Sequence, residues 1–143
     1  MCSILGVFDL RSGTDITPLR PLALSLSAQQ RHRGPDWSGV HADKAAILVH
    51  ERLAIVDPAG GSQPLRSADG QLVLAVNGEI YNHRELEHQL AAPYAFQTKS
   101  DCEVIHALHA QPDSVGAWIC KLNGISAFAL WDRTRQSVVV ARD

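Results

Sequence analysis

Cys2 combines two groups that acyl-transfer chemistry uses: a thiol and, once Met1 is removed, a free α-amino group. An α-amine titrates near pH about 7.7–8.0, so it can accept the thiol proton near neutrality and later return a proton to a leaving amine. A residue that carries nucleophile and base together could attack a carbonyl carbon. Free cysteine is also a common small apolar residue in buried strands, and for Cys2 alone that structural interpretation is the stronger one.

Two further groupings could suggest chemistry. His106 and His109 are three residues apart on an expected helix, but no companion cysteine or acid completes a ligand set, so we expect ordinary helix histidines and no metal. The cations of RHRGPD (residues 31–36) could suggest a phosphate or nucleic-acid site. The chain has a formal net charge of -2 and no basic stripe, so we expect no nucleic-acid partner.

The composition is that of one globular domain covering residues 1–143. The 143 residues are 45% hydrophobic and 20% charged, which is typical of a packed core and excludes disordered and fibrous classes. No apolar run is long enough to span a bilayer and no basic n-region marks a signal peptide, so we expect a cytoplasmic protein without membrane contact. Cys2, Cys102 and Cys120 lack CxxC spacing, which predicts neither disulfides nor a zinc site; Cys102 and Cys120 are expected to pack on helices.

The elements that must position these residues are strands, then helices, then strands. Apolar runs and turn residues predict strands over residues 2–9, 38–41, 45–54, 71–76, 125–131 and 137–141, and helices over 19–30, 82–90, 100–109 and 114–122. Asn82 with Glu85 and Ser100 with Glu103 have capping-box spacing. The order favours an α+β layered domain over a parallel βαβ sheet.

Seven motifs occur in a recognisable order along nearly the whole chain: MCSILGVF, RHRGPDWSG, HERLAIVD, GGSQPL, AVNGEIYNH, SDCEVI and AFALWD. Together they resemble the class II glutamine amidotransferases. The run HERLAIVDPAGGSQPL is most similar to the glutaminase domains of glutamine-dependent asparagine synthetases. The resemblance implies an N-terminal nucleophile hydrolase fold, a four-layer αββα sandwich in which two antiparallel sheets lie between helix layers.

The resemblance also implies a reaction. Cys2 would attack the side-chain amide of glutamine and form a glutamyl thioester, which water hydrolyses to glutamate, with ammonia as the other product. The Asn77 side-chain amide and the Gly78 backbone N–H match the oxyanion hole of these enzymes, which stabilises charge that develops in the transition state. Taken alone, Asn77-Gly78 would be a turn between a strand and a helix. Residues 31–36 match a segment that supports the site.

The remaining matches concern the amino-acid end of glutamine. Arg52 matches the residue that pairs with the α-carboxylate, for which guanidinium geometry is suited. Glu79 and Asp101 match the acceptors for the α-ammonium, and the backbone of Ile55 and Val56 lies in the matching substrate loop. Singly, these residues would be a surface arginine, a solvent-facing glutamate, a helix N-terminal aspartate and loop residues.

The resemblance implies that the ammonia supplies asparagine synthesis from aspartate and ATP, by a synthetase domain in cis or in trans. No cofactor is then expected for this chain, and ATP and Mg²⁺ belong only to the synthetase domain. The family continues past Asp143 with further strands, so we expect a domain that is incomplete at its C-terminal end. Two alternatives stay open: a glutaminase domain that serves another acceptor, and a non-catalytic binding module or pseudoenzyme, for example with Met1 retained. A homodimer also stays open.

Overall fold

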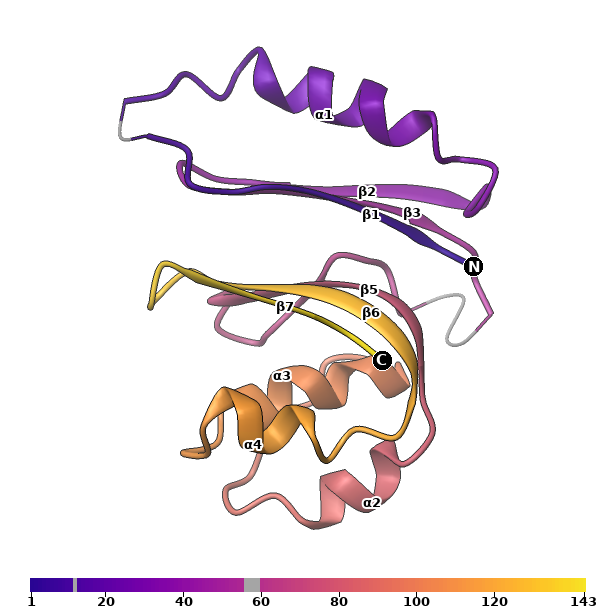
Figure 1. The fold of residues 1–143 in the computed structure, drawn as a ribbon, viewed down its shortest axis with the longest axis vertical. Helices are drawn as coiled ribbons and strands as arrows, with labels where there is room; N and C mark the ends of the chain where they lie inside the picture. Colours follow the sequence, from indigo (N-terminus) through magenta and orange to yellow (C-terminus); the bar gives the residue numbers. More distant parts are fainter. Residues whose placement is uncertain (12, 56–59) are drawn as a thin grey trace.

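The computed structural model describes residues 1–11, 13–55 and 60–143, which form four layers (Figure 1). Helix α1 covers a three-stranded sheet, which stacks on a four-stranded sheet, and short helices cover the far face of the second sheet. The helices are α1 (Leu19–Ala28), α2 (His83–His88), the 3-10 helix η1 (Asp101–Glu103), α3 (Val104–His109) and α4 (Val115–Ile119). The predicted αββα layering is therefore confirmed.

Each sheet is antiparallel throughout. The first has the order β1-β3-β2, and the second has the order β4-β5-β6-β7. The strands are β1 (Ser3–Val7), β2 (Trp37–Ala42), β3 (Ile47–Arg52), β4 (Leu65–Arg66), β5 (Leu72–Ile80), β6 (Gly124–Asp132) and β7 (Ser137–Arg142). Strands β5 and β6 pair along their whole length, from Leu72 opposite Asp132 to Ile80 opposite Gly124. This long pair is the most regular part of the fold.

Alternation of side chains along β3 explains how the first sheet is covered on both faces. Ile47 and Val49 pack with Ala23 of α1, and all three are buried. Leu48, between them, points to the opposite face and packs with Val73 of the second sheet. Because successive strand residues face opposite sides and both sides are covered, the first half of β3, residues 47–49, is apolar throughout. Every residue of β3 is buried.

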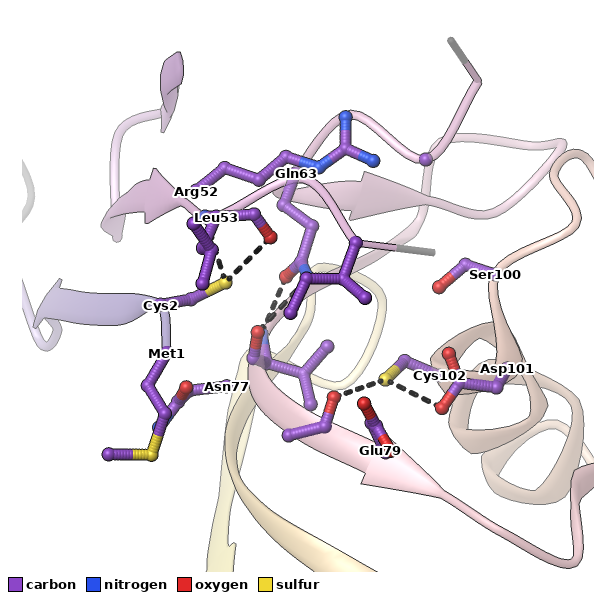
Figure 2. Close-up of a pocket in the computed structure, with 14 residues that line it drawn as sticks. Met1, Cys2, Arg52, Leu53, Gln63, Asn77, Glu79, Ser100, Asp101 and Cys102 are labelled. Atoms are coloured by element: carbon purple, nitrogen blue, oxygen red, sulfur yellow. Dashed lines mark hydrogen bonds between the residues drawn. The ribbon is translucent and has the colours of Figure 1, made fainter. Parts of the chain in front are cut away.

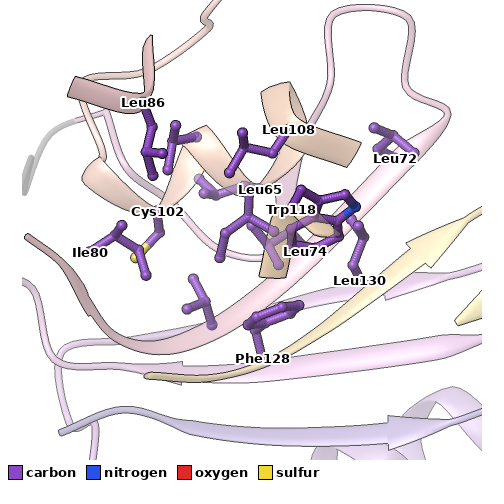
Figure 3. Close-up of a cluster of buried hydrophobic side chains, with 13 residues drawn as sticks. Leu65, Leu72, Leu74, Ile80, Leu86, Cys102, Leu108, Trp118, Phe128 and Leu130 are labelled. Carbon is purple, nitrogen blue, oxygen red and sulfur yellow. The ribbon is translucent and has the colours of Figure 1, made fainter. Parts of the chain in front are cut away.

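A second core fills the space between the four-stranded sheet and its helices (Figure 3). Leu74 and Val76 of β5 and Phe128 of β6 face this layer, where Trp118 of α4 stacks on Phe128 with ring centroids 6.1 Å apart. Full burial of one such side chain contributes about 1.5–3 kcal/mol. This core holds the second sheet and α4 together.

The structure differs from the predicted elements mainly at their ends. Strand β5 continues to Ile80 where the prediction stopped at residue 76, because the Asn-Gly pair lies inside the strand and forms no turn. Strand β4 was not predicted, since it has only two residues. The helices are shorter than predicted, and no helix of the described ranges is long and apolar enough to cross a membrane.

Both capping-box predictions were wrong. Asn82 lies at the N-cap of α2 without capping it, because its side chain donates to Lys121 O and accepts from Asn123 N–H instead. Ser100 makes no side-chain cap to η1. The carboxylate of Glu103 accepts from the backbone N–H groups of residues 97 and 98. Tertiary contacts therefore outcompete local capping at these two helix starts.

Candidate active site

Strand alternation directs three of the predicted site residues into the space between the sheets. Cys2 precedes β1 and has the same parity as Ile4, which packs in the cluster between the two sheets. Arg52 ends β3 with the parity of Leu48, which belongs to the same cluster. Asn77 lies on the same face of β5 as the earlier residues of that strand that belong to this cluster. All three side chains consequently meet at one end of the sandwich.

One pocket contains every predicted site residue that the structure describes (Figure 2). Its lining includes Cys2, Arg52, Ile55, Asn77, Gly78, Glu79 and Asp101. Ile55 lies at the rim, where its side chain is 66% exposed. Val56 lies outside the described residues. The motifs therefore converge in space although they are spread over a hundred positions of the sequence.

Cys2, the predicted nucleophile, is held by Leu53, directly after β3, and by Arg33. The Leu53 N–H donates to Cys2 Sγ at 3.3 Å, and the thiol lies 3.7 Å from Leu53 O, as Figure 2 shows. Arg33 Nε donates to Cys2 O at 3.1 Å. Met1, which precedes Cys2, is 70% exposed. The thiol is therefore fixed while the residue that must be removed to free its amine is accessible.

The segment 31–36 connects Cys2 to the end of β3, where Arg52 lies. Besides the bond from Arg33, the Asp36 N–H donates to Arg52 O at 3.0 Å, and Asp36 Oδ2 accepts from Ala54 N–H at 2.8 Å. Gly34 lies against β3 so closely that a Cβ would come within 2.2 Å of Glu51 O. Only glycine allows this approach. These contacts match the supporting role predicted for this segment.

Gly78 places a backbone amide at the edge of the pocket. Its φ of +147° and a Cβ position 2.0 Å from Ile125 O both require glycine. Gly78 lies opposite Ser126, but the N–H and C=O of Ser126 bond to Asp143 on the β7 side. The polar groups of Gly78 therefore point away from β6 and toward the pocket. The Asn77 side chain and the Gly78 N–H border the cavity that Cys2 also lines.

The pocket has a cation on one side and two carboxylates on another (Figure 2). Arg52 is 5% exposed, and Asp101 is 8% exposed. Asp101 Oδ2 accepts from Ile80 N–H at 2.6 Å, which orients the carboxylate of this pocket-lining residue. Glu79 is exposed beside it. This charge distribution complements a zwitterionic amino acid.

Sequence reasoning missed several residues that shape the pocket. Gln63 belongs to the GGSQPL motif but had been given no role, and it lines the cavity. His50 Nε2 lies 2.9 Å from Val76 O, and burial lowers the pKa of His50 to about 4. Cys102 packs in the core as predicted, yet its thiol also lies 3.6 Å from Gly78 O. The signal available for all three was their position within or beside a site motif.

The two helix histidines lie away from the pocket, in the helix layer. His109 Nε2 lies 3.0 Å from Asp132 Oδ2, and burial lowers the pKa of His106 to about 3. Within the described ranges, no group of three or more histidine, cysteine or acidic residues could hold a metal ion. Both histidines are buried and belong to the packing of α3.

Comparison with known proteins adds an independent result. Residues 1–143 match the glutamine amidotransferase domain family. Asparagine synthetase B (glutamine-hydrolyzing) of Escherichia coli strain K12 is 51% identical over 143 residues, which are 100% of this chain and 25% of that protein. The probable asparagine synthetase (glutamine-hydrolyzing) of Schizosaccharomyces pombe is 50% identical with the same coverage. The chain thus spans about a quarter of the length of these relatives.

A solved structure shares the fold. The glutamine phosphoribosylpyrophosphate amidotransferase of B. subtilis, complexed with ADP and GMP, superposes with a TM-score of 0.64 at 22% sequence identity. The match covers 98% of this chain and 37% of that chain. At this identity the likeness concerns the fold, and it agrees with the predicted N-terminal nucleophile hydrolase type.

Proposed function

The chain belongs to the glutamine amidotransferase domain family, and from that premise we propose that it hydrolyses the side-chain amide of glutamine to glutamate and ammonia through a thioester on Cys2. The observation that carries the proposal is the convergence of thiol, oxyanion donors and opposite charges in one pocket. A surface cavity without a catalytic role would have no reason to combine a cysteine thiol with a glycine-dependent backbone amide, an arginine on one side and two carboxylates on another.

Glutamine would bind with its α-carboxylate on Arg52 and its α-ammonium between Asp101 and Glu79. Arg52 is buried at the end of β3, so its side chain is already restrained before the substrate arrives. Asp101 is oriented by the Ile80 N–H. Such preorganised charged groups fix the amino-acid end and leave the side-chain amide to extend toward Cys2.

The attack begins with transfer of the Cys2 thiol proton to its own α-amine, which is free after removal of Met1. The thiolate then forms a C–S bond to the amide carbon, and the carbonyl oxygen becomes an oxyanion. The Gly78 N–H and the Asn77 side-chain amide would donate to that oxygen, while the Leu53 N–H holds the sulfur. The donors act where charge develops, which lowers the barrier more than it tightens substrate binding.

Collapse of this intermediate breaks the C–N bond. The α-ammonium of Cys2 gives its proton to the departing nitrogen, which leaves as ammonia, and a glutamyl thioester remains. Water, deprotonated by the same amine, attacks the thioester through a second oxyanion and releases glutamate with a regenerated thiol. Proton donor and acceptor are the same group in both halves of the reaction.

We further propose that the ammonia serves asparagine synthesis, because the relatives from E. coli and S. pombe are asparagine synthetases. The partner is then a synthetase domain, joined to this chain or bound to it. Glutamine hydrolysis by this scheme needs no cofactor, and we assign ATP and Mg²⁺ to that synthetase domain. A cytoplasmic location, a homodimer and an incomplete C-terminal end stay predictions.

Ammonia release from glutamine tests the hydrolysis directly. We expect the unmodified protein to release ammonia and glutamate in equal amounts, with intact mass showing loss of Met1 and one glutamyl adduct when the thioester is trapped. Cys2→Ala should release none, whereas Cys120→Ala, which alters an exposed cysteine away from the pocket, should behave as the parent. Equal ammonia release by the parent and Cys2→Ala would contradict the mechanism.

A further inference from the structure

The edge of β5 that faces away from β6 has a different kind of hydrogen-bond partner at each successive position. Every second residue on this strand turns its backbone N–H and C=O toward the edge that β6 does not cover. Leu74 is paired there with Leu65 of β4. Strand β4 has only two residues, so the ladder that it starts ends before the oxyanion residues. Farther along, the Ile80 N–H donates to Asp101.

Gln63 fills the rung after the end of β4. The Val76 N–H donates to Gln63 Oε1 at 2.7 Å, and Gln63 Nε2 donates to Val76 O at 3.0 Å. A side-chain amide has the donor and acceptor of a peptide group, so this pair reproduces one rung of an antiparallel ladder without a strand. His50 Nε2 also lies 2.9 Å from Val76 O. Val76 is therefore fixed from two elements.

The next rung on this edge is Gly78. Its N–H is the backbone donor assigned above to the oxyanion, and its C=O lies 3.6 Å from the Cys102 thiol. If a strand residue occupied the position of Gln63, β4 would extend along the edge toward Gly78 and compete for that N–H. The Gln63 side chain instead bonds to the N–H and C=O of Val76 and does not extend the ladder any farther. The edge of β5 is therefore hydrogen-bonded as far as Val76, and the Gly78 N–H beyond it stays available for the oxyanion.

We propose that Gln63 is a positioning residue for glutamine hydrolysis, whose side-chain amide stands in for a strand rung and fixes the Asn77 and Gly78 donors at the oxyanion position. The inference rests on the proposed function. Gln63 acts through Val76, the residue directly before Asn77, so its effect should fall on transition-state stabilisation. Binding of the amino-acid end, which uses Arg52 and Asp101, should change little.

The test uses Gln63→Glu and Gln63→Leu in the whole protein. Gln63→Glu keeps the shape and can accept from the Val76 N–H, but it cannot donate to Val76 O. Gln63→Leu loses both bonds. Gln136→Glu, in the exposed turn between β6 and β7, makes the same change of charge at the end of the β5–β6 pair away from Gly78 and serves as the matched control.

Three readouts separate positioning from general damage. We expect kcat for glutamine to fall about 10- to 100-fold in both Gln63 variants, as when reacting groups are misplaced by about an ångström, with KM within about 3-fold. Alkylation of Cys2 by iodoacetamide forms no oxyanion, so its rate should stay unchanged. Affinity for the aldehyde analogue of glutamine, which forms a tetrahedral adduct with the thiol, should fall in parallel with kcat.

Hydrogen exchange supplies a readout that does not depend on activity. The Val76 amide should exchange faster in Gln63→Leu than in the parent, because its acceptor is lost. An unchanged kcat in both variants, or iodoacetamide alkylation that falls together with kcat, would overturn the proposal. Absence of glutamine hydrolysis by the parent would instead overturn the proposed function, and the two failures are distinct because only the second appears in the parent.

Discussion

The three-stranded sheet carries its site residues at strand ends, whereas the four-stranded sheet carries them inside a strand of nine residues. Cys2 precedes β1, and Arg52 is the last residue of β3. Asn77 and Gly78 lie inside β5, which pairs with β6 along its whole length. Strand ends have fewer ladder bonds to hold them, so the first sheet needs support from outside itself.

That support is the segment 31–36, which contacts Cys2 and the end of β3. In the second sheet, the pairing of β5 with β6 holds the site residues, and the Gln63 side chain adds one more pair of hydrogen bonds to β5. The comparison teaches that the nucleophile side should tolerate changes in its chemistry without loss of the fold. On the oxyanion side, chemistry and fold share the same backbone, so substitutions there should affect both.

Cys2→Ala gives the largest expected effect and tests the first half of this contrast. Loss of the nucleophile should lower the rate of glutamine hydrolysis by about four orders of magnitude or more. Because Cys2 is only partly buried ahead of β1, the free energy of unfolding should change by less than about 1 kcal/mol. Ammonia release and urea unfolding measure the two quantities. A large loss of stability would show that the nucleophile side is also part of the fold.

Gly78→Ala tests the second half. The new Cβ would lie 2.0 Å from Ile125 O, and φ at +147° disfavours any side chain. We expect kcat to fall about 10²- to 10³-fold and stability to fall by about 1–3 kcal/mol. Gly116→Ala is the control, since a Cβ there meets no atom within 4 Å. If stability stayed at the parent value while kcat fell, chemistry and fold would be separable on this sheet too.

Arg33→Met removes the bond to Cys2 O and leaves the nucleophile itself intact. A displaced thiol should lower kcat about 10-fold, with little change in stability, because the donor is only partly buried. Arg31→Met, at an exposed position of the same segment, makes the same substitution as a control. Steady-state kinetics with glutamine gives the comparison, and equal kcat for both variants would remove the segment from the support of the nucleophile.

Much of the fold and of the site could be predicted from the sequence. The ordered motifs predicted the fold class and the membership of the pocket, because each motif carries residue types that the chemistry needs. Alternation along β1, β3 and β5 also determines that Cys2, Arg52 and Asn77 face the same space. Local patterns of this kind can be predicted from sequence because a strand has only two faces.

The sequence did not predict how the edge of β5 is completed or where the helices are capped. Gln63 bonds to Val76, thirteen positions away, through a side chain, and no periodicity encodes such a contact. Asn82 had capping-box spacing but bonds to residues 39 and 41 positions later. Strand β4 is too short to have a pattern. These features depend on tertiary contacts that local spacing does not specify.

Asp43 joins the two sheets away from the site, and its substitution gives the smallest expected effect on activity. Its carboxylate accepts from the Trp131 indole on β6 at 3.0 Å and from Arg133 Nε at 3.2 Å. It also accepts from the N–H groups of residues 45 and 46 at 2.9 Å. Burial alone would raise the pKa of Asp43, but the hydrogen bonds from residues 45 and 46, from Trp131 and from His41 hold it at about 2.

A carboxyl whose pKa is lowered by folding stabilises the protein above its unfolded pKa, near 3.8, and that contribution disappears as pH falls toward about 2. We expect Asp43→Asn to lower the free energy of unfolding at pH 7 by about 1–2 kcal/mol and to remove part of the loss seen in the parent between pH about 4 and 2. Glutamine turnover should stay within about 2-fold, since Asp43 does not line the pocket. Asp113→Asn, in an exposed pair with Lys121, should cost less than about 1 kcal/mol. Urea unfolding at several pH values measures the change in stability, and steady-state kinetics with glutamine measures turnover. A turnover loss as large as that of Arg33→Met would mean that the site depends on sheet stacking as much as on the contacts at its own end.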